Sequence, residues 1–230
     1  MTPPHRLVAL LPLKGHSARV PGKNFKGFAG RPLVRHILDT LLEIAEIERV
    51  VINTDARETL ERLGIGDGPR VLIRDRRPEI CGDFVSMNRV IEDDVEAVPG
   101  DVYLMTHTTN PLLGAATIRR AIEACAVARA EGRADSLFTV NRVQTRLYDA
   151  AGRAINHDPA NLVRTQDLEP WFEENSNLYI FTRDSFAATR ARIGARPMMF
   201  ETPRAESVDI DDLHGWHMAE ALALAGTAAR

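Results

Sequence analysis

Four cations lie close together near the start of the chain, in the segment 10–26. Lys14, Arg19, Lys23 and Lys26 share this segment with two glycines and follow a short apolar run. Glycine lets backbone N–H groups approach an anion, and lysine and arginine place full positive charges against phosphoryl oxygens. The segment therefore predicts a phosphate-binding loop, although a solvated basic loop would have the same composition.

This loop matches neither of the two common phosphate motifs. A Walker A loop has four residues between its first glycine and its Gly-Lys pair, followed by Ser or Thr. Here six residues separate Gly15 from Gly22, and Asn24 follows Lys23. The loop also lacks the G-x-G-x-x-G string that opens a helix in dinucleotide-binding proteins. A P-loop ATPase and a plain Rossmann dehydrogenase are both excluded.

A pair of carboxylates near the other end of the chain complements these cations. Asp209 and Asp211 lie two residues apart, so in an extended segment they project to the same side. Magnesium commonly binds one or two carboxylates together with phosphate oxygens and water. The pair therefore predicts a Mg²⁺ site facing the loop. Alternatively, the acidic run caps a helix and places Asp212 in its first turn.

The elements that must position these groups alternate between strand and helix patterns. Strands are expected at 7–13, 49–55, 70–74, 101–105 and 135–140, and helices at 33–44, 85–98 and 115–131. A strand at 177–182, a helix at 184–192, a strand at 198–201 and a helix at 213–228 complete the pattern. It predicts a three-layer α/β/α fold with a mostly parallel sheet, whose ligand lies beyond the carboxyl ends of the strands.

The alternation of strand and helix patterns stops between residues 141 and 177. This polar stretch contains Trp171 and Phe172 and shows no clear periodicity. It is too long for a simple connection between two elements. We expect one domain over residues 1–230 with an inserted arm at 141–177.

The bulk composition limits the classes of partner. The chain has 230 residues, 44% hydrophobic and 27% charged residues, and a net charge of −3, as is ordinary for a soluble globular protein. This balance disfavours nucleic acid as a partner. The N-terminus lacks a signal-peptide pattern, and no long apolar run occurs, so we expect a cytoplasmic protein without a membrane partner.

Eight blocks of residues are spread in order along nearly the whole chain: Lys14-Gly-His-Ser-Ala-Arg-Val-Pro-Gly-Lys-Asn-Phe-Lys26, Ala29-Gly-Arg-Pro-Leu33, Val51-Ile-Asn-Thr-Asp55, Arg77-Pro78 through Asp83 and Ser86, Thr108-Thr-Asn-Pro-Leu112, Arg164-Thr-Gln166, Asn175-Ser-Asn-Leu-Tyr179 and Glu206-Ser-Val-Asp-Ile-Asp211. Together they resemble the motifs of the acylneuraminate cytidylyltransferases, the family of CMP-sialic acid synthetases.

The resemblance implies a Rossmann-like nucleotidyltransferase fold and a Mg²⁺-dependent enzyme. Such an enzyme transfers CMP from CTP to the hydroxyl of an acidic sugar, such as a nonulosonic acid, and releases pyrophosphate. The family also implies a homodimer whose arm contacts the partner. Lys23, Arg19, Asp209 and Asp211 would be catalytic, the two aspartates holding the metal. Substrate contacts would come from Leu13, Lys14, Ser17, Asn24, Arg77, Ser86, His107, Thr108, Asn110, Arg164, Gln166 and Asn175.

Three departures from the family pattern bear on this interpretation. Ala18 and Arg19 replace the family's Lys-Gly after the loop serine, and we expect Arg19 to substitute for that lysine. His107 replaces a glutamine, and its charge would vary near pH 6.5. Glu173 replaces the arginine of the Phe-Arg-Pro-Asn-Gly segment and would repel an acidic sugar. The acceptor is then another nonulosonic acid, a modified Kdo, an amino-substituted acid sugar or a non-sugar nucleophile such as a phosphonate.

Two other classes of function remain open from the sequence. Asp209-Ile-Asp211 also spells the Asp-x-Asp metal motif of nucleotide-sugar glycosyltransferases, although there it normally follows a middle strand. A catalytically silent nucleotide-binding module is the other alternative, but both Lys23 and the aspartates are present. Sugar transfer without pyrophosphate release, or CTP binding without turnover, would favour these alternatives respectively.

Overall fold

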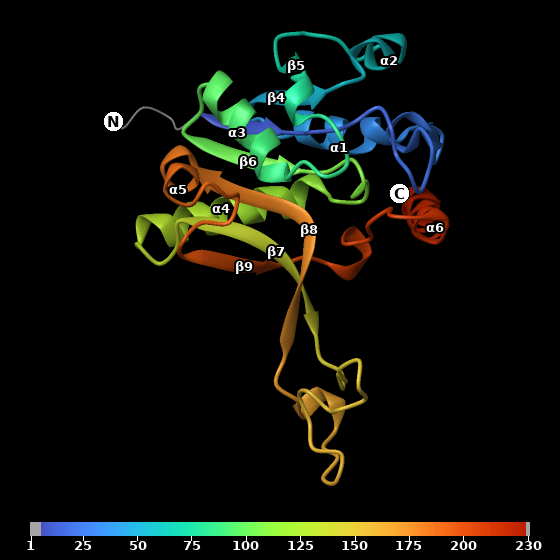
Figure 1. Ribbon diagram of the computed structural model, residues 1–230, viewed down its shortest axis with the longest axis vertical. Coiled ribbons are helices and arrows are strands. Elements are labelled where there is room, and N and C mark those ends of the chain that lie inside the picture. The colour runs from blue at the N-terminus through green and yellow to red at the C-terminus, as the bar shows by residue number, and fades with distance from the viewer. Residues whose placement is uncertain (1–5, 229–230) are drawn as a thin grey trace.

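A seven-stranded sheet forms the centre of the protein in the computed structural model, which describes residues 6–228 (Figure 1). Its strand order is β5-β4-β1-β6-β8-β7-β9. The bounds are β1 Leu7–Leu10, β4 Ile47–Thr54, β5 Val71–Asp75, β6 Val102–Thr106, β7 Ser136–Val143, β8 Trp171–Thr182 and β9 Pro197–Glu201. Among these strands β8 alone runs antiparallel to its neighbours, so the sheet is mostly parallel as expected.

Helices cover both faces of this sheet and make the three layers. They are α1 Leu33–Leu42, α2 Arg57–Arg62, α3 Met87–Ala97, α4 Ala115–Ala130, α5 Arg183–Thr189 and α6 Leu213–Ala228. On β6, Leu104 packs with α1 and α4 in one buried cluster, whereas Tyr103 and Met105 pack with α3 and α5 in another. Alternate residues of a strand point to opposite faces, so the buried strand β6 contributes side chains to the hydrophobic clusters on both faces of the sheet.

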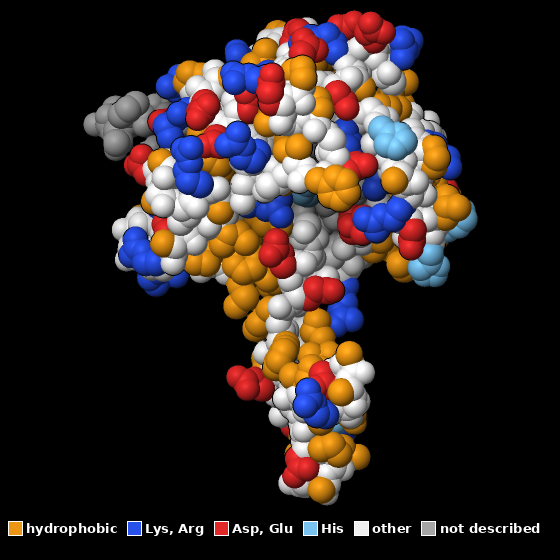
Figure 2. All heavy atoms as spheres, viewed as in Figure 1, with side chains coloured by type: hydrophobic (Ala, Val, Ile, Leu, Met, Phe, Trp, Pro, Cys, Tyr) orange, Lys and Arg blue, Asp and Glu red, His pale blue; other side chains and the backbone are white. Residues whose placement is uncertain are grey.

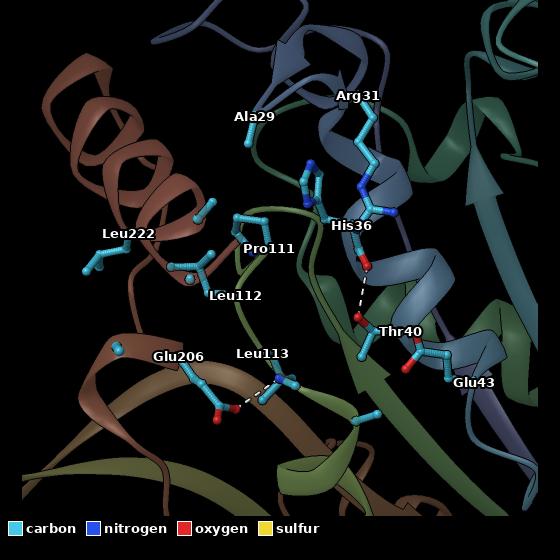
Figure 3. A pocket seen from close by; sticks show the side chains of 15 residues that line it. Ala29, Arg31, His36, Thr40, Glu43, Pro111, Leu112, Leu113, Glu206 and Leu222 are labelled. Carbon is cyan, nitrogen blue, oxygen red and sulfur yellow. Dashed lines mark hydrogen bonds between the residues drawn. The ribbon is translucent and has the colours of Figure 1, made fainter. Parts of the chain in front are cut away.

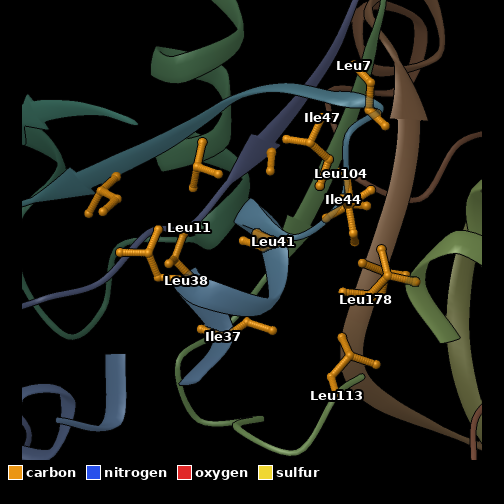
Figure 4. Packing of buried hydrophobic residues seen from close by; sticks show 14 of the residues in the cluster. Leu7, Leu11, Ile37, Leu38, Leu41, Ile44, Ile47, Leu104, Leu113 and Leu178 are labelled. Carbon is orange, nitrogen blue, oxygen red and sulfur yellow. The ribbon is translucent and has the colours of Figure 1, made fainter. Parts of the chain in front are cut away.

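The cluster under α1 shows why this helix forms where it does. Ile37, Leu38 and Leu41 recur at helical spacing and are fully or almost fully buried. They contact strand residues such as Leu11 and Leu104 (Figure 4). This packing fixes the end of β1, and with it the start of the basic loop.

The inserted arm is an extension of two sheet strands. The outer ends of β7 and β8 pair from Val140 opposite Glu174 to Val143 opposite Trp171, and the chain between them projects away from the body (Figure 1). The arm exposes several large apolar side chains, and hydrophobic groups are visible along it in Figure 2. They include Tyr148, Ile155, Leu162, Trp171 and Phe172.

The observed bounds differ from the predicted ones at the arm, at the first strand, in one small helix that was not predicted, and at the helix predicted for 184–192, which ends at Thr189. The strand predicted at 177–182 begins at Trp171, because its first residues pair with the end of β7. The first strand is assigned only to Leu10, although Leu11 and Leu13 still donate backbone hydrogen bonds to Val51 and Asn53. The six-residue α2 was missed, because it is too short for a periodic pattern. Between residues 6 and 228, no helix combines the length and apolarity required to cross a membrane.

Candidate active site

The basic loop lies at the point where the sheet topology reverses. From β1 the chain moves outward to β4 and β5, and then returns to β6 on the other side of β1. The carboxyl ends of the two strands flanking such a switch point form a crevice in which ligands bind. A cavity of about 270 Å³ opens there, lined by Leu13 and the loop after β1, by residues 107–109 after β6 and by the start of α3. We call it the loop pocket.

Lys23 enters this pocket from a short 3₁₀ turn, Lys23–Phe25. Gly22 precedes the turn with a φ of +64°, a left-handed conformation that glycine adopts without strain. The Lys23 Nζ donates to the carbonyl oxygen of Ile210 at 2.6 Å. Burial lowers the Lys23 pKa from its ordinary value, while Asp209 and Asp211 oppose that shift. An ammonium group has three donors, so two remain for a ligand.

Ile210 anchors the acidic segment in the protein. Its side chain is fully buried in a small cluster with Phe28 and Trp216, and its backbone N–H donates to the Thr109 carbonyl at 2.9 Å. Because neighbours along an extended chain point oppositely, burial of Ile210 turns both flanking aspartates outward together. Arg19 and Asp211 form an ion pair at 3.0 Å. The structure thus joins the two ends of the chain at one site.

The two aspartates suit a hard divalent cation that shares its coordination with phosphate. Burial raises the pKa of Asp209 and the like charge of Asp211 raises it further, whereas a hydrogen bond with Thr109 and the nearby Lys23 and Arg19 lower it. In the described part of the chain, no group of three or more His, Cys, Asp or Glu residues is placed to hold a metal ion. A two-carboxylate set completed by phosphate oxygens and water is the arrangement that Mg²⁺ favours.

Hydrogen bonds of a side-chain amide link the basic loop to the segment that follows β6. Asn24 is buried, its Nδ2 donates to the Lys14 carbonyl at 2.8 Å, and its Oδ1 accepts from the Thr108 hydroxyl. The Lys14 ammonium forms an ion pair with Asp83 across the pocket. Ser17 also lines the cavity. These contacts shape the pocket before any ligand enters it.

His107 lines the loop pocket, and two nearby cations act on its imidazole. Burial, then the charge of Arg192 and then that of Lys23, lower its pKa to about 3. The expectation that its charge varies near pH 6.5 is therefore wrong, because solvated imidazole is a poor guide to a desolvated ring between cations. The neutral ring can still donate one hydrogen bond and accept another.

Arg76 is a pocket residue that the sequence analysis missed. Its Nη2 donates to the carbonyls of Leu13 at 3.0 Å and Asn53 at 2.8 Å, and its Nε donates to Asn53 Oδ1 at 2.9 Å. Asn53 in turn donates to the buried Asp94 at 2.8 Å. Burial raises the pKa of Asp94 to about 6, against the lowering effects of Asn53 and the neighbouring Arg74.

Arg77, which was expected to contact the nucleotide, is directed elsewhere. Its Nε pairs with Asp93 at 3.0 Å, and it lines a different surface hollow with Glu92 and Arg190. The Arg-Arg-Pro string gave no signal that distinguishes the two arginines, because the turn after β5 decides which of them faces the pocket.

Several other predicted residues do not line the loop pocket. Ser86 caps α3 by accepting from the Asn88 N–H at 3.3 Å. Asn110 is fully buried, and its amide atoms have no hydrogen-bond partner among the described residues. Asn175 donates to Thr202 at 2.7 Å, close to the acidic segment.

Arg164 and Gln166 lie on the arm, away from the loop pocket of their own chain. The guanidinium of Arg164 is paired with Asp167 at 2.7 Å, and the backbone carbonyl of Gln166 accepts from Gln144 at 2.8 Å. Within one chain the structure does not bring them to the site (Figure 1).

A larger cavity of about 550 Å³ lies between α1 and α6 (Figure 3). Several of its polar side chains have partners within the fold. Glu206 accepts from the Gly114 N–H at 2.9 Å and from the Thr117 hydroxyl at 3.0 Å, and so caps α4. The His36 Nε2 lies 2.9 Å from the Phe28 carbonyl oxygen. The cations and the paired aspartates belong to the smaller loop pocket and its border.

Fold and site together define a nucleotide-binding α/β protein, with a cationic loop and two carboxylates meeting at the switch point of the sheet. The sequence profile of the family described as Cytidylyltransferase matches residues 8–211. The chain therefore belongs to the cytidylyltransferase family.

The chain is also similar to individual proteins whose names fit this family. The chain is 28% identical to an N-acylneuraminate cytidylyltransferase of Oncorhynchus mykiss, over 93% of this chain and 49% of that protein. It thus spans about half the length of this relative. It is 26% identical to the CMP-N,N'-diacetyllegionaminic acid synthase of Legionella pneumophila, over 94% of this chain and 96% of that protein.

A solved structure confirms the fold. The CMP:2-keto-3-deoxy-manno-octonic acid synthetase complexed with CTP superposes with a TM-score of 0.67 over 96% of this chain and 99% of that chain. The identity is 16%, so this likeness shows the nucleotidyltransferase fold alone.

Proposed function

We propose that the chain is a Mg²⁺-dependent cytidylyltransferase that transfers CMP from CTP to the anomeric hydroxyl of a nonulosonic acid in the cytoplasm. The observation that carries the proposal is the contact of Lys23 with the Asp209–Asp211 segment at the switch point. A cation and two carboxylates at that position suit a magnesium-bound triphosphate. The acceptor class follows from the relatives that share this family, one of which matches over nearly its full length.

In the proposed reaction, the anomeric oxygen of the acceptor bonds to the α-phosphorus of CTP. The bond from that phosphorus to the bridging oxygen breaks, pyrophosphate leaves with the electron pair, and the hydroxyl proton passes to solvent. Lys23 offsets negative charge that develops on the phosphoryl oxygens. The nucleotide is oriented against the pocket lining, which includes Arg76, Asn24 and Thr108. When bound by Asp209 and Asp211, Mg²⁺ would shield the phosphates and acidify the attacking hydroxyl.

The test is release of pyrophosphate by the purified chain with CTP and Mg²⁺. N-acetylneuraminate, N,N'-diacetyllegionaminate and Kdo are compared as acceptors, and we expect turnover of a nonulosonic acid with Kdo the poorest. Asp209→Asn should reduce turnover on the order of 100-fold while the circular dichroism spectrum is retained. Absence of both pyrophosphate release and CTP binding by the wild type would refute the proposal. CTP binding without turnover of any acceptor would instead favour a silent binding module.

We propose further that the arm completes the site of a second copy of the chain. Two observations support a homodimer: the arm exposes Trp171, Phe172 and Leu162, and it carries Arg164 and Gln166 away from the loop pocket of its own chain. Exposed aromatic side chains are common anchors of interfaces.

Mixed dimers test whether Arg164 acts on the partner's site. Arg164→Ala and Asp209→Asn chains are each expected to be nearly inactive alone. If Arg164 acts across the dimer, mixing and re-equilibrating them produces one intact site per mixed dimer, or about a quarter of wild-type activity. No recovery in a mixture shown by mass measurement to contain mixed dimers would place Arg164 in its own chain's site or outside any site.

A further inference from the structure

An arginine outside the motifs considered so far lies near His107, a residue that lines the loop pocket. Arg192 follows α5, and its side chain is 20% exposed. Its guanidinium lies over the Tyr179 ring, with the guanidinium carbon 3.9 Å from the ring centroid. Its backbone N–H donates to Asn88 Oδ1 at 3.3 Å, which ties this segment to the first turn of α3. Stacking of this kind holds a guanidinium plane in one orientation.

Arg192 lies near the end of β6, close enough to His107 of the loop pocket for its charge to act on the imidazole. Its Nη1 lies 4.0 Å from the sulfur of Met105, two residues before His107 on the chain that leaves β6. Met105 packs with α3 and α5, so Arg192 lies on that side of the sheet, and His107 follows directly after the end of β6. Lys23, which would bind the phosphates, acts on His107 together with Arg192. An acceptor beside His107 therefore has the phosphate cation and Arg192 as charged neighbours.

The donors of Arg192 are poorly used within the described residues. Its Nη2 is 3.6 Å from Glu174 Oε1, longer than a hydrogen bond, and that same oxygen accepts from the Tyr179 hydroxyl. The sulfur of Met105 is a weak acceptor. Arginine has five N–H donors in a planar fork that matches a carboxylate. The guanidinium is thus oriented, partly accessible and without a matched bidentate partner.

The chemistry of the proposed acceptor matches this position. In a nonulosonic acid the carboxylate is attached to the anomeric carbon that bears the attacking hydroxyl, so a cation for it must lie close to the reacting centre. Glu173 stands where sialic acid enzymes have an arginine, and here it is an exposed residue that accepts from Asn141 at 3.2 Å. A carboxylate-binding cation must therefore come from another position.

We propose that Arg192, oriented by Tyr179, recognises the acceptor carboxylate as a bidentate ion pair. The inference rests on the proposed function and adds a specificity residue to it. An acidic sugar is then compatible with Glu173, because the carboxylate of the sugar would be bound at Arg192 and not at the base of the arm.

The test compares Arg192→Gln with Arg190→Gln. Arg190 lies two residues earlier, is exposed and pairs with Glu92, so its replacement is a matched loss of charge outside the pocket. N-acetylneuraminate and N,N'-diacetyllegionaminate are each assayed beside their C1 methyl esters. For Arg192→Gln we expect the KM for the acid to rise about 30- to 100-fold, as for a lost charge-assisted pair, with the KM for CTP within about twofold. Activity on the ester should change little, and Arg192→Lys should restore part of the affinity for the acid.

Two results would overturn the assignment. One is an acid KM that rises no more in Arg192→Gln than in Arg190→Gln. The other is an equal loss of activity on acid and ester, which would show a general structural role. Melting temperature and CTP affinity are measured for each variant, so that misfolding is recognised directly. A wild type that turns over neither acid overturns the proposed function together with this inference, whereas an active wild type with an unaffected Arg192→Gln overturns this inference alone.

Discussion

The ammonium group of Lys23 donates to the carbonyl oxygen of Ile210 at 2.6 Å, across 187 positions of sequence. The same backbone segment accepts from Lys23 on one side and donates to Thr109 on the other. Lys23 and the carboxylate pair are therefore linked through the backbone of Ile210. Displacing one of them should displace the other.

Lys23→Met tests the charge while it retains most of the apolar stem. We expect turnover to fall on the order of 100- to 1000-fold, because an ammonium aimed at the phosphoryl oxygens is lost from a partly desolvated site. Lys26→Met is the matched control, since Lys26 lies over the Trp216 ring, 4.8 Å from its centroid, and does not line the loop pocket. Steady-state release of pyrophosphate measures both variants. Equal losses in the two would show that Lys23 has no special role.

Gly215→Ala tests whether the first turn of α6 holds the acidic segment in place. A Cβ at Gly215 would lie 2.8 Å from the backbone oxygen of Asp209, so the helix or the segment must move. We expect activity to fall on the order of 10- to 100-fold and the Mg²⁺ concentration for half-maximal activity to rise.

Gly226→Ala is the control on the same helix, because a Cβ there meets nothing within 4 Å. It should leave activity unchanged and stabilise the helix by up to about 1 kcal/mol. A Gly215→Ala protein with wild-type activity and wild-type Mg²⁺ dependence would show that Asp209 tolerates displacement.

The sequence alone predicted those strands and site segments that are determined by a local residue pattern. A buried β-branched run predicted β4, the alternation of apolar segments predicted β6, and the Gly-Lys loop and the Asp-x-Asp pair predicted the two segments that meet at the site. Other features depend on contacts between distant segments. The reversed direction of β8 cannot be read from its side-chain pattern, and the position of Arg192 depends on the packing of the chain after α5 on Tyr179.

The two adjacent arginines after β5 give a prediction that tests whether the arginine placed in the pocket by the structure, or the one suggested by the sequence motif, contributes to CTP binding. Arg76 is held in the pocket by the carbonyls of Leu13 and Asn53, whereas Arg77 pairs with Asp93 outside it. Arg76→Met should weaken CTP binding on the order of tenfold, and Arg77→Met should change it by less than about twofold. Isothermal titration of CTP gives both affinities. Weaker binding only in Arg77→Met would restore the assignment suggested by the Arg-Pro pattern.

His107 gives a prediction for the dependence of stability on pH. Burial between Arg192 and Lys23 holds its pKa at about 3, so it stays neutral in the folded protein where the unfolded chain takes up a proton below about pH 6.5. The unfolded state then binds more protons, and the stability contributed by neutral His107 is complete above that pH and is lost as pH falls. The loss approaches about 1.4 kcal/mol per pH unit below pH 6.5.

His107→Gln removes this titration while it keeps a side chain that can both donate and accept. Urea unfolding of the wild type and the variant at pH 7.5 and pH 5.5 isolates the effect, because Asp94 and the other titrating groups are common to both proteins. We expect the variant to gain about 1 kcal/mol relative to the wild type between the two pH values. A difference between the two proteins that is the same at both pH values would mean that the folded state also protonates His107 near pH 6.5. The imidazole would then be solvated in the folded protein, in contradiction to the burial that lowers its pKa here.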